Sequence, residues 1–237
     1  MFRPQTLSRY AAALMLAAGA VAHAGARPAV VELYTSQGCS SCPPADALLG
    51  ELAKRADVLA LAFHVDYWDD LGWRDRFALP LATERQSQYA QRLMIASPYT
   101  PQMVIDGTKE AVGNERERIY RLLAVPHVGV PVHVEFQGAE LTVRVEPATG
   151  MAAGDVVLIS YLPSAVTAIG RGENAGRELR EFNIVRSLKT LGTWQGAAAE
   201  WRVARKSLPA DAEYVAVLVQ QPGPRAIIGA VSAALPR

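Results

Sequence analysis

The sequence holds two cysteines, Cys39 and Cys42, which stand two residues apart in the run Cys-Ser-Ser-Cys and are the only cysteines among 237 residues. A disulfide between them closes a very small loop, so it removes little entropy from the unfolded chain and is a poor structural staple. Without a third or fourth cysteine, this chain alone cannot build a four-thiolate zinc site. The spacing therefore favours reversible thiol–disulfide exchange.

The residues on either side of the cysteines indicate how the pair is positioned. The apolar run 29–34 predicts a strand, residues 36–38 a turn, and the apolar spacing from Ala45 onward a helix, with Pro43 and Pro44 in its first turn. This order places the first cysteine at a helix N-terminus, where free N–H groups and the helix dipole favour a thiolate. We predict that Cys39 is the nucleophile and that Cys42, one helical turn later, is the resolving thiol.

The remaining elements divide the chain near residue 128. Before that point the pattern alternates between strands and helices: strands at 58–65, 103–105 and 110–112, and helices at 83–94 and 115–123. After it the pattern is mostly β, with strands expected at 132–136, 141–146, 156–162, 200–205, 214–220 and 226–232. We expect an α/β domain followed by a smaller, mostly β region packed on it.

A second motif, Thr100-Pro101, lies just before the strand expected at 103–105. The sequence of a strand, Cys-x-x-Cys, a helix, Thr-Pro and a hairpin resembles the thioredoxin superfamily. The resemblance implies a thioredoxin-like domain over 25–127, followed by the β-rich C-terminal region 128–237. It also implies that Pro101 is cis and that its loop lies against the cysteines, so that Thr100 and Pro101 bind the substrate.

Four longer stretches carry a closer resemblance. They are similar to an uncharacterised family of secreted bacterial proteins, domain-of-unknown-function family twelve twenty-three. That family has a thioredoxin-like fold and no established substrate. The stretches are VVELYTSQGCSSCPPAD (30–46), FHVDYWDDLGW (63–73), YTPQMVIDG (99–107) and GRGENAGRELREFNIVR (170–186).

Two features depart from a minimal thioredoxin. An insertion, placed between Asp66 and Thr83, carries Tyr67, Trp68 and Trp73 among several acids. It can cap the active site, with Trp68 touching substrate, or cover the sheet, and covering is the favoured interpretation. Glu32, in the strand before Cys39, is a candidate proton acceptor for Cys42, with a solvated strand acid as the alternative.

The N-terminus has the pattern of a secretory signal peptide. Arg3 and Arg9 precede an uncharged apolar stretch at 11–22 and the small-x-small site Ala22-His23-Ala24. We expect residues 1–24 to be removed and the mature chain to work in the periplasm or outside the cell, where disulfides persist. No stretch is long and apolar enough for a membrane span.

The formal net charge of +1 becomes −1 once Arg3 and Arg9 are removed. This balance argues against nucleic acid as a partner. The run 170–175 formally matches a dinucleotide fingerprint, but no convincing helix follows, so a glycine-rich turn is favoured. His64 can pair with Asp66 or join the cysteines on a metal, although a buried core histidine is favoured. We predict no metal site and no cofactor.

Three functions fit these residues. The leading hypothesis is an exported thiol–disulfide oxidoreductase acting on proteins or small molecules that carry disulfides or dithiols. The second is a non-catalytic binding module with an inert disulfide. The third is a copper(I) carrier using Cys39 and Cys42, with or without His64 as a further ligand.

Overall fold

The computed structural model describes residues 25–236, so the predicted signal peptide at 1–24 lies outside the described residues. The described chain is a mixed α/β structure dominated by strands, with three α-helices: α1 (Pro43–Leu52), α2 (Pro80–Arg92) and α3 (Arg116–Leu123). The strands are β1 (Gly25–Ala26), β2 (Ala29–Thr35), β3 (Val58–His64), β4 (Gln102–Ile105), β5 (Lys109–Val112), β6 (Val128–Gly129), β7 (Val132–Gln137), β8 (Glu140–Val145), β9 (Gly154–Ala168), β10 (Glu178–Trp194), β11 (Ala199–Ala204), β12 (Tyr214–Gln220) and β13 (Ile227–Ala234).

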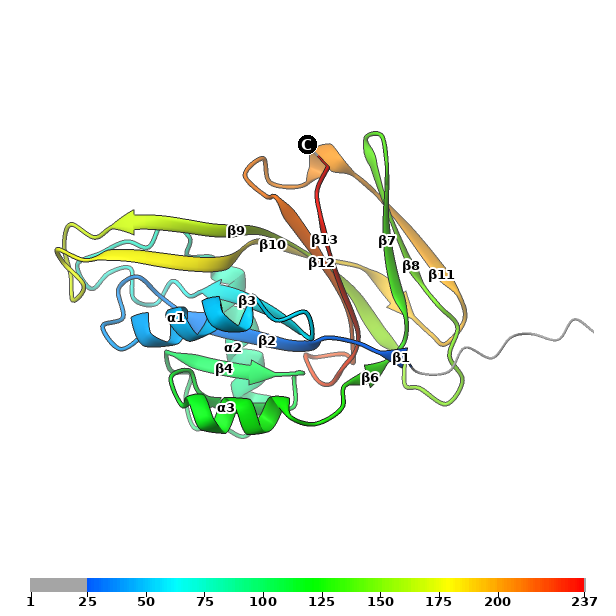
Figure 1. Ribbon diagram of the computed structural model, residues 1–237, viewed down its shortest axis with the longest axis horizontal. Coiled ribbons are helices and arrows are strands. Elements are labelled where there is room, and N and C mark those ends of the chain that lie inside the picture. The colour runs from blue at the N-terminus through cyan, green and yellow to red at the C-terminus, as the bar shows by residue number, and fades with distance from the viewer. Residues whose placement is uncertain (1–24, 237) are drawn as a thin grey trace, which may run out of the picture.

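Eight of these strands form one sheet in the order β13-β12-β9-β10-β3-β2-β4-β5 (Figure 1). β2 lies in its interior, parallel to β3 and antiparallel to β4. All seven residues of β2 and of β3 are buried, as expected for central strands covered on both faces. Strands that precede residue 128 and strands that follow it thus share this sheet. The domain boundary expected near residue 128 stays a prediction.

Alternate residues of β2 and β3 point into two separate cores. On one face Val31 and Leu33 pack with the apolar side of α1 and with Ile119 of α3. On the other face Val30 and Tyr34 pack with Tyr89 of α2. The helices therefore cover both faces of the sheet, α1 and α3 on one and α2 on the other (Figure 1).

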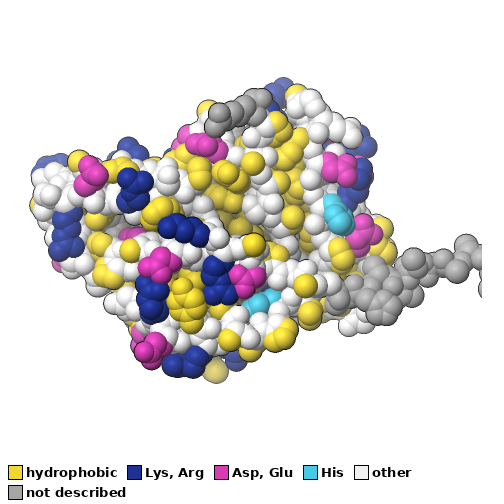
Figure 2. Space-filling model, in the orientation of Figure 1, with side chains coloured by type: hydrophobic (Ala, Val, Ile, Leu, Met, Phe, Trp, Pro, Cys, Tyr) yellow, Lys and Arg dark blue, Asp and Glu magenta, His cyan; other side chains and the backbone are white. Residues whose placement is uncertain are grey.

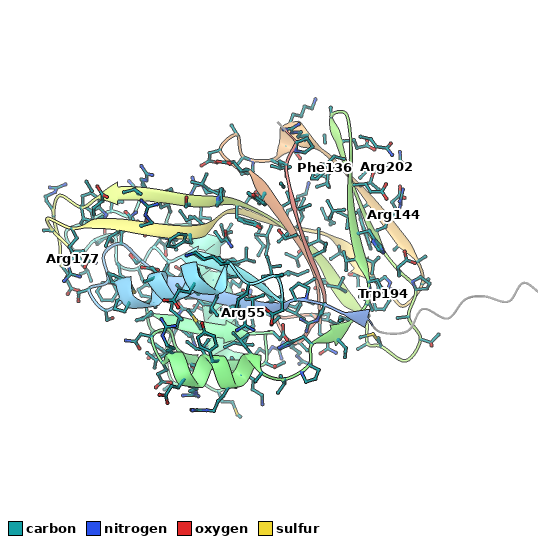
Figure 3. The ribbon with its side chains drawn as sticks, viewed as in Figure 1. Arg55, Phe136, Arg144, Arg177, Trp194 and Arg202 are labelled. Atoms are coloured by element: carbon teal, nitrogen blue, oxygen red, sulfur yellow. A yellow bond between two sulfur atoms is a disulfide. The ribbon has the colours of Figure 1, made fainter. Side chains whose placement is uncertain are left out.

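A second sheet, in the order β11-β8-β7, packs against the far end of the large one. Its inward residues, including Val143 and Val145, share a core with Leu158 of β9, Val217 of β12 and the fully buried Trp194. Figure 3 shows Trp194 at the base of this layer. The β-rich chain after residue 128 therefore supplies both a separate layer and half of the main sheet.

The sequence pattern missed β10, which joins the two halves of the large sheet. β10 is antiparallel to β9 along most of its length, and it pairs with β3 in parallel through Ile184 and Ala62. Asn183 adopts a positive φ of 46°, which Asn tolerates better than most residues, and its amide donates to the Ala60 carbonyl of β3 at 2.8 Å. Few apolar residues alternate regularly along β10, so the strand has little local signal.

The helices and the surface charges bear on whether a membrane or a strongly charged molecule is a partner. Within residues 25–236, no helix has the length and apolar character required to cross a bilayer. On the face shown in Figure 2, basic and acidic side chains are interspersed and neither sign covers a broad area.

Gly113 follows β5 and lies where α1, β2 and the loop before β4 approach one another. A Cβ atom there would stand 2.9 Å from Pro101 Cβ, 3.0 Å from Ala45 Cβ and 3.1 Å from Leu33 Cδ1. We expect Gly113→Ala to lower the free energy of unfolding by about 1–3 kcal/mol through overpacking. Urea denaturation checks this. Gly25→Ala, where a Cβ would meet no atom within 4 Å, is the control; equal stability of the two variants would contradict the packing described.

Candidate active site

The two cysteines lie in the turn that joins β2 to α1. Their sulfurs are bonded to each other, with the Cα atoms 5.4 Å apart. Cys42 is the N-cap residue of α1, and Pro43 and Pro44 occupy the first turn as predicted. The hydroxyl of Ser41 lies 3.4 Å from Cys39 Sγ, so it can donate a hydrogen bond to that sulfur. The disulfide therefore stands at the positive end of a helix beside one hydroxyl donor.

Neither cysteine has any exposed surface, although Ser40 and Ser41 between them are exposed. Burial of both sulfurs differs from the accessible thiolate that the sequence predicts for Cys39. Two segments distant in the sequence cover the cysteine turn: the connection between β9 and β10, and the segment between β3 and α2.

The first cover is the tip of the β9–β10 hairpin, residues 169–177. The amide of Asn174, which is fully buried, donates to the backbone carbonyls of Gln37 and Cys39, each at 2.9 Å. The carboxylate of Glu173 accepts from the Ser40 N–H at 3.1 Å. Arg177, labelled in Figure 3 at the far end of the hairpin, donates to Asn174 Oδ1. The hairpin tip thus binds the backbone on both sides of Cys39.

The second cover is the inserted segment between β3 and α2. The Cβ of Trp68 lies against Gly38, and its indole donates to Thr100 Oγ1 at 2.9 Å. The indole of Trp73 donates to Gln37 Oε1 at 3.0 Å. The favoured expectation that this segment simply covers the sheet is thus incomplete, because it contacts the turn that holds the cysteines. The helix that follows begins at Pro80, before the predicted start at Thr83.

The Thr100–Pro101 peptide bond is cis, as the family resemblance implied. Pro101 is buried, and its carbonyl accepts from the N–H of Gly113 at 2.8 Å. Gly113 also lies against Ala45, in the first turn of α1. The structure therefore brings Thr100, Pro101 and Trp68 to the same end of the sheet as the cysteines.

Glu32 lies on the other face of the sheet. It is fully buried among α2 residues, where its carboxylate accepts from Arg85 through Nε at 2.6 Å and Nη2 at 2.9 Å, and from Tyr89 at 2.7 Å. Side chains of a strand alternate between faces, and α1 packs on the face that Glu32 does not reach. Glu32 is thus committed to a buried ion pair away from the cysteines, and the sequence-based choice of this residue needs correction.

One buried acid on the α1 face is Asp46, which lies one turn after Cys42. Its Oδ1 accepts from Thr35 Oγ1 at 2.8 Å. Burial raises the pKa of Asp46 to about 7. The sequence contained this residue in CSSCPPAD, but an acid in the first turn of a helix also has the ordinary role of favouring the helix dipole, so its burial gave no signal.

His64 ends β3 and is buried, as the favoured interpretation had it, but its partner is not Asp66. Its Nδ1 lies 2.7 Å from Asp75 Oδ2 and 3.8 Å from Glu181 Oε1. Burial opposes the charged imidazolium, but the Asp75, Glu181 and Asp46 carboxylates together outweigh it and raise the pKa of His64 to about 9. Asp66 instead contacts Thr83.

Gln37, two residues before Cys39, connects this polar cluster to the cysteine turn. Its N–H donates to Asp75 Oδ2 and its side-chain amide donates to Glu181 Oε2, both at 2.9 Å. Gln37, Asp75, Asn174 and Glu181 were not singled out from the sequence. The 170–186 stretch used for the family resemblance contained two of them, but its glycine pattern indicated only a turn. The dinucleotide match at 170–175 is indeed a turn, the hairpin tip.

Comparison with known proteins identifies relatives of the whole fold. A family model described as a protein of unknown function (DUF1223) matches residues 30–220. No match was found among curated proteins.

Similar solved structures include the crystal structure of a protein from Agrobacterium tumefaciens, a structural genomics target. It is 32% identical, with a TM-score of 0.77, and the match covers 88% of this chain and 94% of that one. HBP35 of Porphyromonas gingivalis is 14% identical, with a TM-score of 0.60, and the match covers 89% of this chain and 76% of that one. The second likeness concerns the fold alone.

The burial of Asp46 makes stability depend on pH. Native Asp46 keeps its proton up to about pH 7, whereas the ordinary pKa of a free aspartate is 3.8. The native state therefore binds more protons between these pH values, and this residue costs stability as the pH rises through them. We expect the difference in free energy of unfolding between Asp46→Asn and wild type to shift in favour of the variant by about 2–4 kcal/mol from pH 4 to pH 8.

Urea unfolding of the oxidised protein at the two pH values measures this difference. Asp70→Asn, at an exposed position, is the control and should follow wild type at both. A constant difference between Asp46→Asn and wild type would contradict the raised pKa.

Proposed function

The chain belongs to the DUF1223 family of proteins of unknown function, and we propose that it is a thiol–disulfide oxidoreductase whose Cys39–Cys42 pair becomes accessible when the β9–β10 hairpin tip moves away. The observation that carries the proposal is the disulfide itself. It spans a sequence separation of only 3, at the start of a helix, in a chain with no other cysteine. Such a loop adds little stability, so reactivity explains the pair better than stapling.

The surroundings of the pair support a thioredoxin-like unit. β2 leads into the cysteines, with parallel β3 on one side and antiparallel β4 on the other, and the Thr100–Pro101 loop enters β4. α1 and α3 cover one face and α2 the other. In this interpretation the strands from β9 onward extend the unit, and the hairpin of β9 and β10 forms its lid.

The exchange reaction uses only the two sulfurs and the substrate disulfide. The Cys39 thiolate attacks one substrate sulfur, forming a mixed disulfide and expelling the other sulfur as a thiolate. The Cys42 thiolate then attacks Cys39 Sγ, which forms the Cys39–Cys42 bond and releases the second substrate thiolate. The substrate gains two electrons and the protein loses two, and the same steps run backward when the protein oxidises a dithiol.

Several groups near the pair are suited to these steps. The positive end of α1 and the Ser41 hydroxyl stabilise negative charge on Cys39. Trp68 lies beside Gly38 and donates to Thr100, which precedes Pro101, and we assign these three residues to substrate binding, with a protein or small-molecule disulfide or dithiol as substrate. The signal-like residues 1–24 support work outside the cytoplasm, where an oxidised pair persists.

A specific observation favours a second candidate, a binding module with an inert disulfide. Both cysteines are without exposed surface, and the hairpin tip is hydrogen-bonded on either side of Cys39. Under this alternative the cover is permanent and the disulfide resists reducing agents in the native state.

Reduction of insulin by the protein, with dithiothreitol as the source of electrons, tests the proposed activity. We expect wild type to accelerate the reaction and Cys39→Ser to fall to the uncatalysed rate, because the attacking sulfur is lost. Cys42→Ser should accumulate a mixed disulfide with the substrate, detectable by mass spectrometry, because the resolving sulfur is lost. Ser40→Ala, which removes an exposed hydroxyl between the cysteines, is the control. A wild-type rate equal to that of Cys39→Ser would reject the activity.

The role of the hairpin as a lid predicts the effect of Asn174→Ala. This change removes two hydrogen bonds that hold the tip to the cysteine turn. If they contribute about 1.4 kcal/mol to closure, the open population and the rate at which dithiothreitol reduces the native disulfide rise about tenfold. Asn114→Ala, at an exposed position, should leave the rate unchanged. If wild type and Asn174→Ala both resist reduction until they unfold, the result would favour the alternative of a binding module with an inert disulfide.

A further inference from the structure

Three side chains capable of binding a metal meet in the buried space behind the cysteine turn. They come from three separate elements: His64 at the end of β3, Asp75 in the segment before α2, and Glu181 in β10. Their potential ligand atoms all lie within 4.8 Å of one another. We infer that His64, Asp75 and Glu181 form a binding site for one first-row divalent cation. This inference does not depend on the proposed redox activity.

The charge balance of this region favours a cation. Asp75 and Glu181 are at most 3% exposed, and Asp46 lies nearby at 7%. Among the described residues, no Lys or Arg forms an ion pair with any of these three carboxylates, and His64 is the one basic group within 4.0 Å of any of them. One imidazolium can balance only one carboxylate, and a bound divalent cation would offset the cost of the remaining buried negative charge.

The cluster also has unused ligand atoms. Glu181 Oε1 and His64 Nε2 are buried and have no hydrogen-bond partner. Glu181 Oε1 is directed toward the cluster, 3.8 Å from His64 Nδ1, which itself lies 2.7 Å from Asp75 Oδ2. A metal ion bound to Nδ1 would replace its proton and occupy the space between the three atoms. Separations of this size suit ligands that share an ion at about 2.0–2.2 Å.

Neighbouring donors already orient the two carboxylates. Asp75 Oδ1 accepts from the N–H of Phe77 at 2.8 Å, and Asp75 Oδ2 from the N–H of Gln37. Glu181 Oε2 accepts from the Gln37 amide at 2.9 Å, which leaves Oε1 available. Such second interactions are typical of metal sites, where they fix the direction of each ligand.

The ligand set indicates the class of metal. One imidazole and two carboxylates supply nitrogen and oxygen donors, which suit Zn²⁺, Mn²⁺ or Fe²⁺, whereas copper(I) prefers sulfur. The cysteines are not part of the set, because their sulfurs are bonded to each other. The site therefore differs from the copper(I) site considered from the sequence, which used the two cysteines.

Metal titration of the oxidised, full-length mature protein tests the inference. The protein is stripped with a chelator, equilibrated separately with ZnCl₂ and MnCl₂, and analysed for bound metal after gel filtration. We expect about one ion per wild-type chain for at least one of the two metals. Thermal unfolding should show a higher Tm with that metal, because a ligand that binds only the native state stabilises it.

Glu181→Gln and Asp75→Asn keep the shape of the side chain and remove a charged ligand, so each should lose the bound ion and the Tm increase. His133→Gln is the matched control, because His133 is 53% exposed and pairs with Glu146 away from the cluster. It should bind metal like wild type. Near-ultraviolet circular dichroism shows whether each variant is folded. Should Asp75→Asn fail to fold, Glu181→Gln decides the question.

Two results would overturn the inference. One is folded wild-type protein that binds neither metal, in which case a protonated His64 alone balances the carboxylates. The other is equal binding by folded Glu181→Gln and wild type, which would place the ion elsewhere. The metal titration uses protein whose cysteines stay oxidised. A protein that fails to reduce insulin would therefore count against the proposed redox activity and not against the metal site.

Discussion

The pairing of β10 with β3 is the contact on which the rest of this structure depends. It joins the strands that follow residue 128 to those around the cysteines, through the Ile184–Ala62 pair and the Asn183 side chain bound to the Ala60 carbonyl. From this pair the hairpin of β9 and β10 reaches the cysteine turn, where Asn174 at its tip donates to the Cys39 carbonyl (Figure 1). That extension places the hairpin tip over the cysteine turn and Glu181 beside His64. One strand contact thus sets both the access to the disulfide and the composition of the polar cluster behind it.

Gln37 connects the cysteine turn to its polar surroundings through several hydrogen bonds. Its backbone and side chain bind two buried carboxylates and the Trp73 indole, while Asn174 binds its carbonyl. Buried polar groups are stable only when they are paired, so these partners fix one another's positions. Any movement that exposes Cys39 has to break the contacts of the hairpin tip, whereas the contacts with Asp75 and Glu181 can persist. In the proposed mechanism, the hairpin tip is therefore the part that opens, and Gln37 with its two carboxylates is the part that stays in place.

The two sides of the central sheet handle buried charge differently. Glu32 is neutralised by a bidentate contact with Arg85, so that face is a closed ion pair within the core. On the α1 face, three acids share one histidine. The Glu32–Arg85 ion pair needs no further partner, whereas a buried cluster with an excess of acids, next to the cysteine turn, is typical of functional sites. This contrast adds support to the proposal that function resides on the α1 face, where the disulfide lies.

The sequence by itself determined the features that depend on neighbouring residues. Two cysteines one helical turn apart, prolines at the start of α1, and the apolar runs of β2 and β3 depend on local geometry, and the structure has all of them. Only the tertiary structure decided which acids meet the cysteine turn and whether the sulfurs are covered. Glu32 is closer to Cys39 in sequence than Glu181 is, but the alternation of side chains along β2 directs Glu32 to the opposite face of the sheet. Glu181 lies 144 positions from Gln37 in sequence, and the pairing of β10 brings the two side chains into contact. Periodicity describes the chain over a few turns, whereas such contacts depend on how distant strands align, and β10 carried too little alternation to reveal its place.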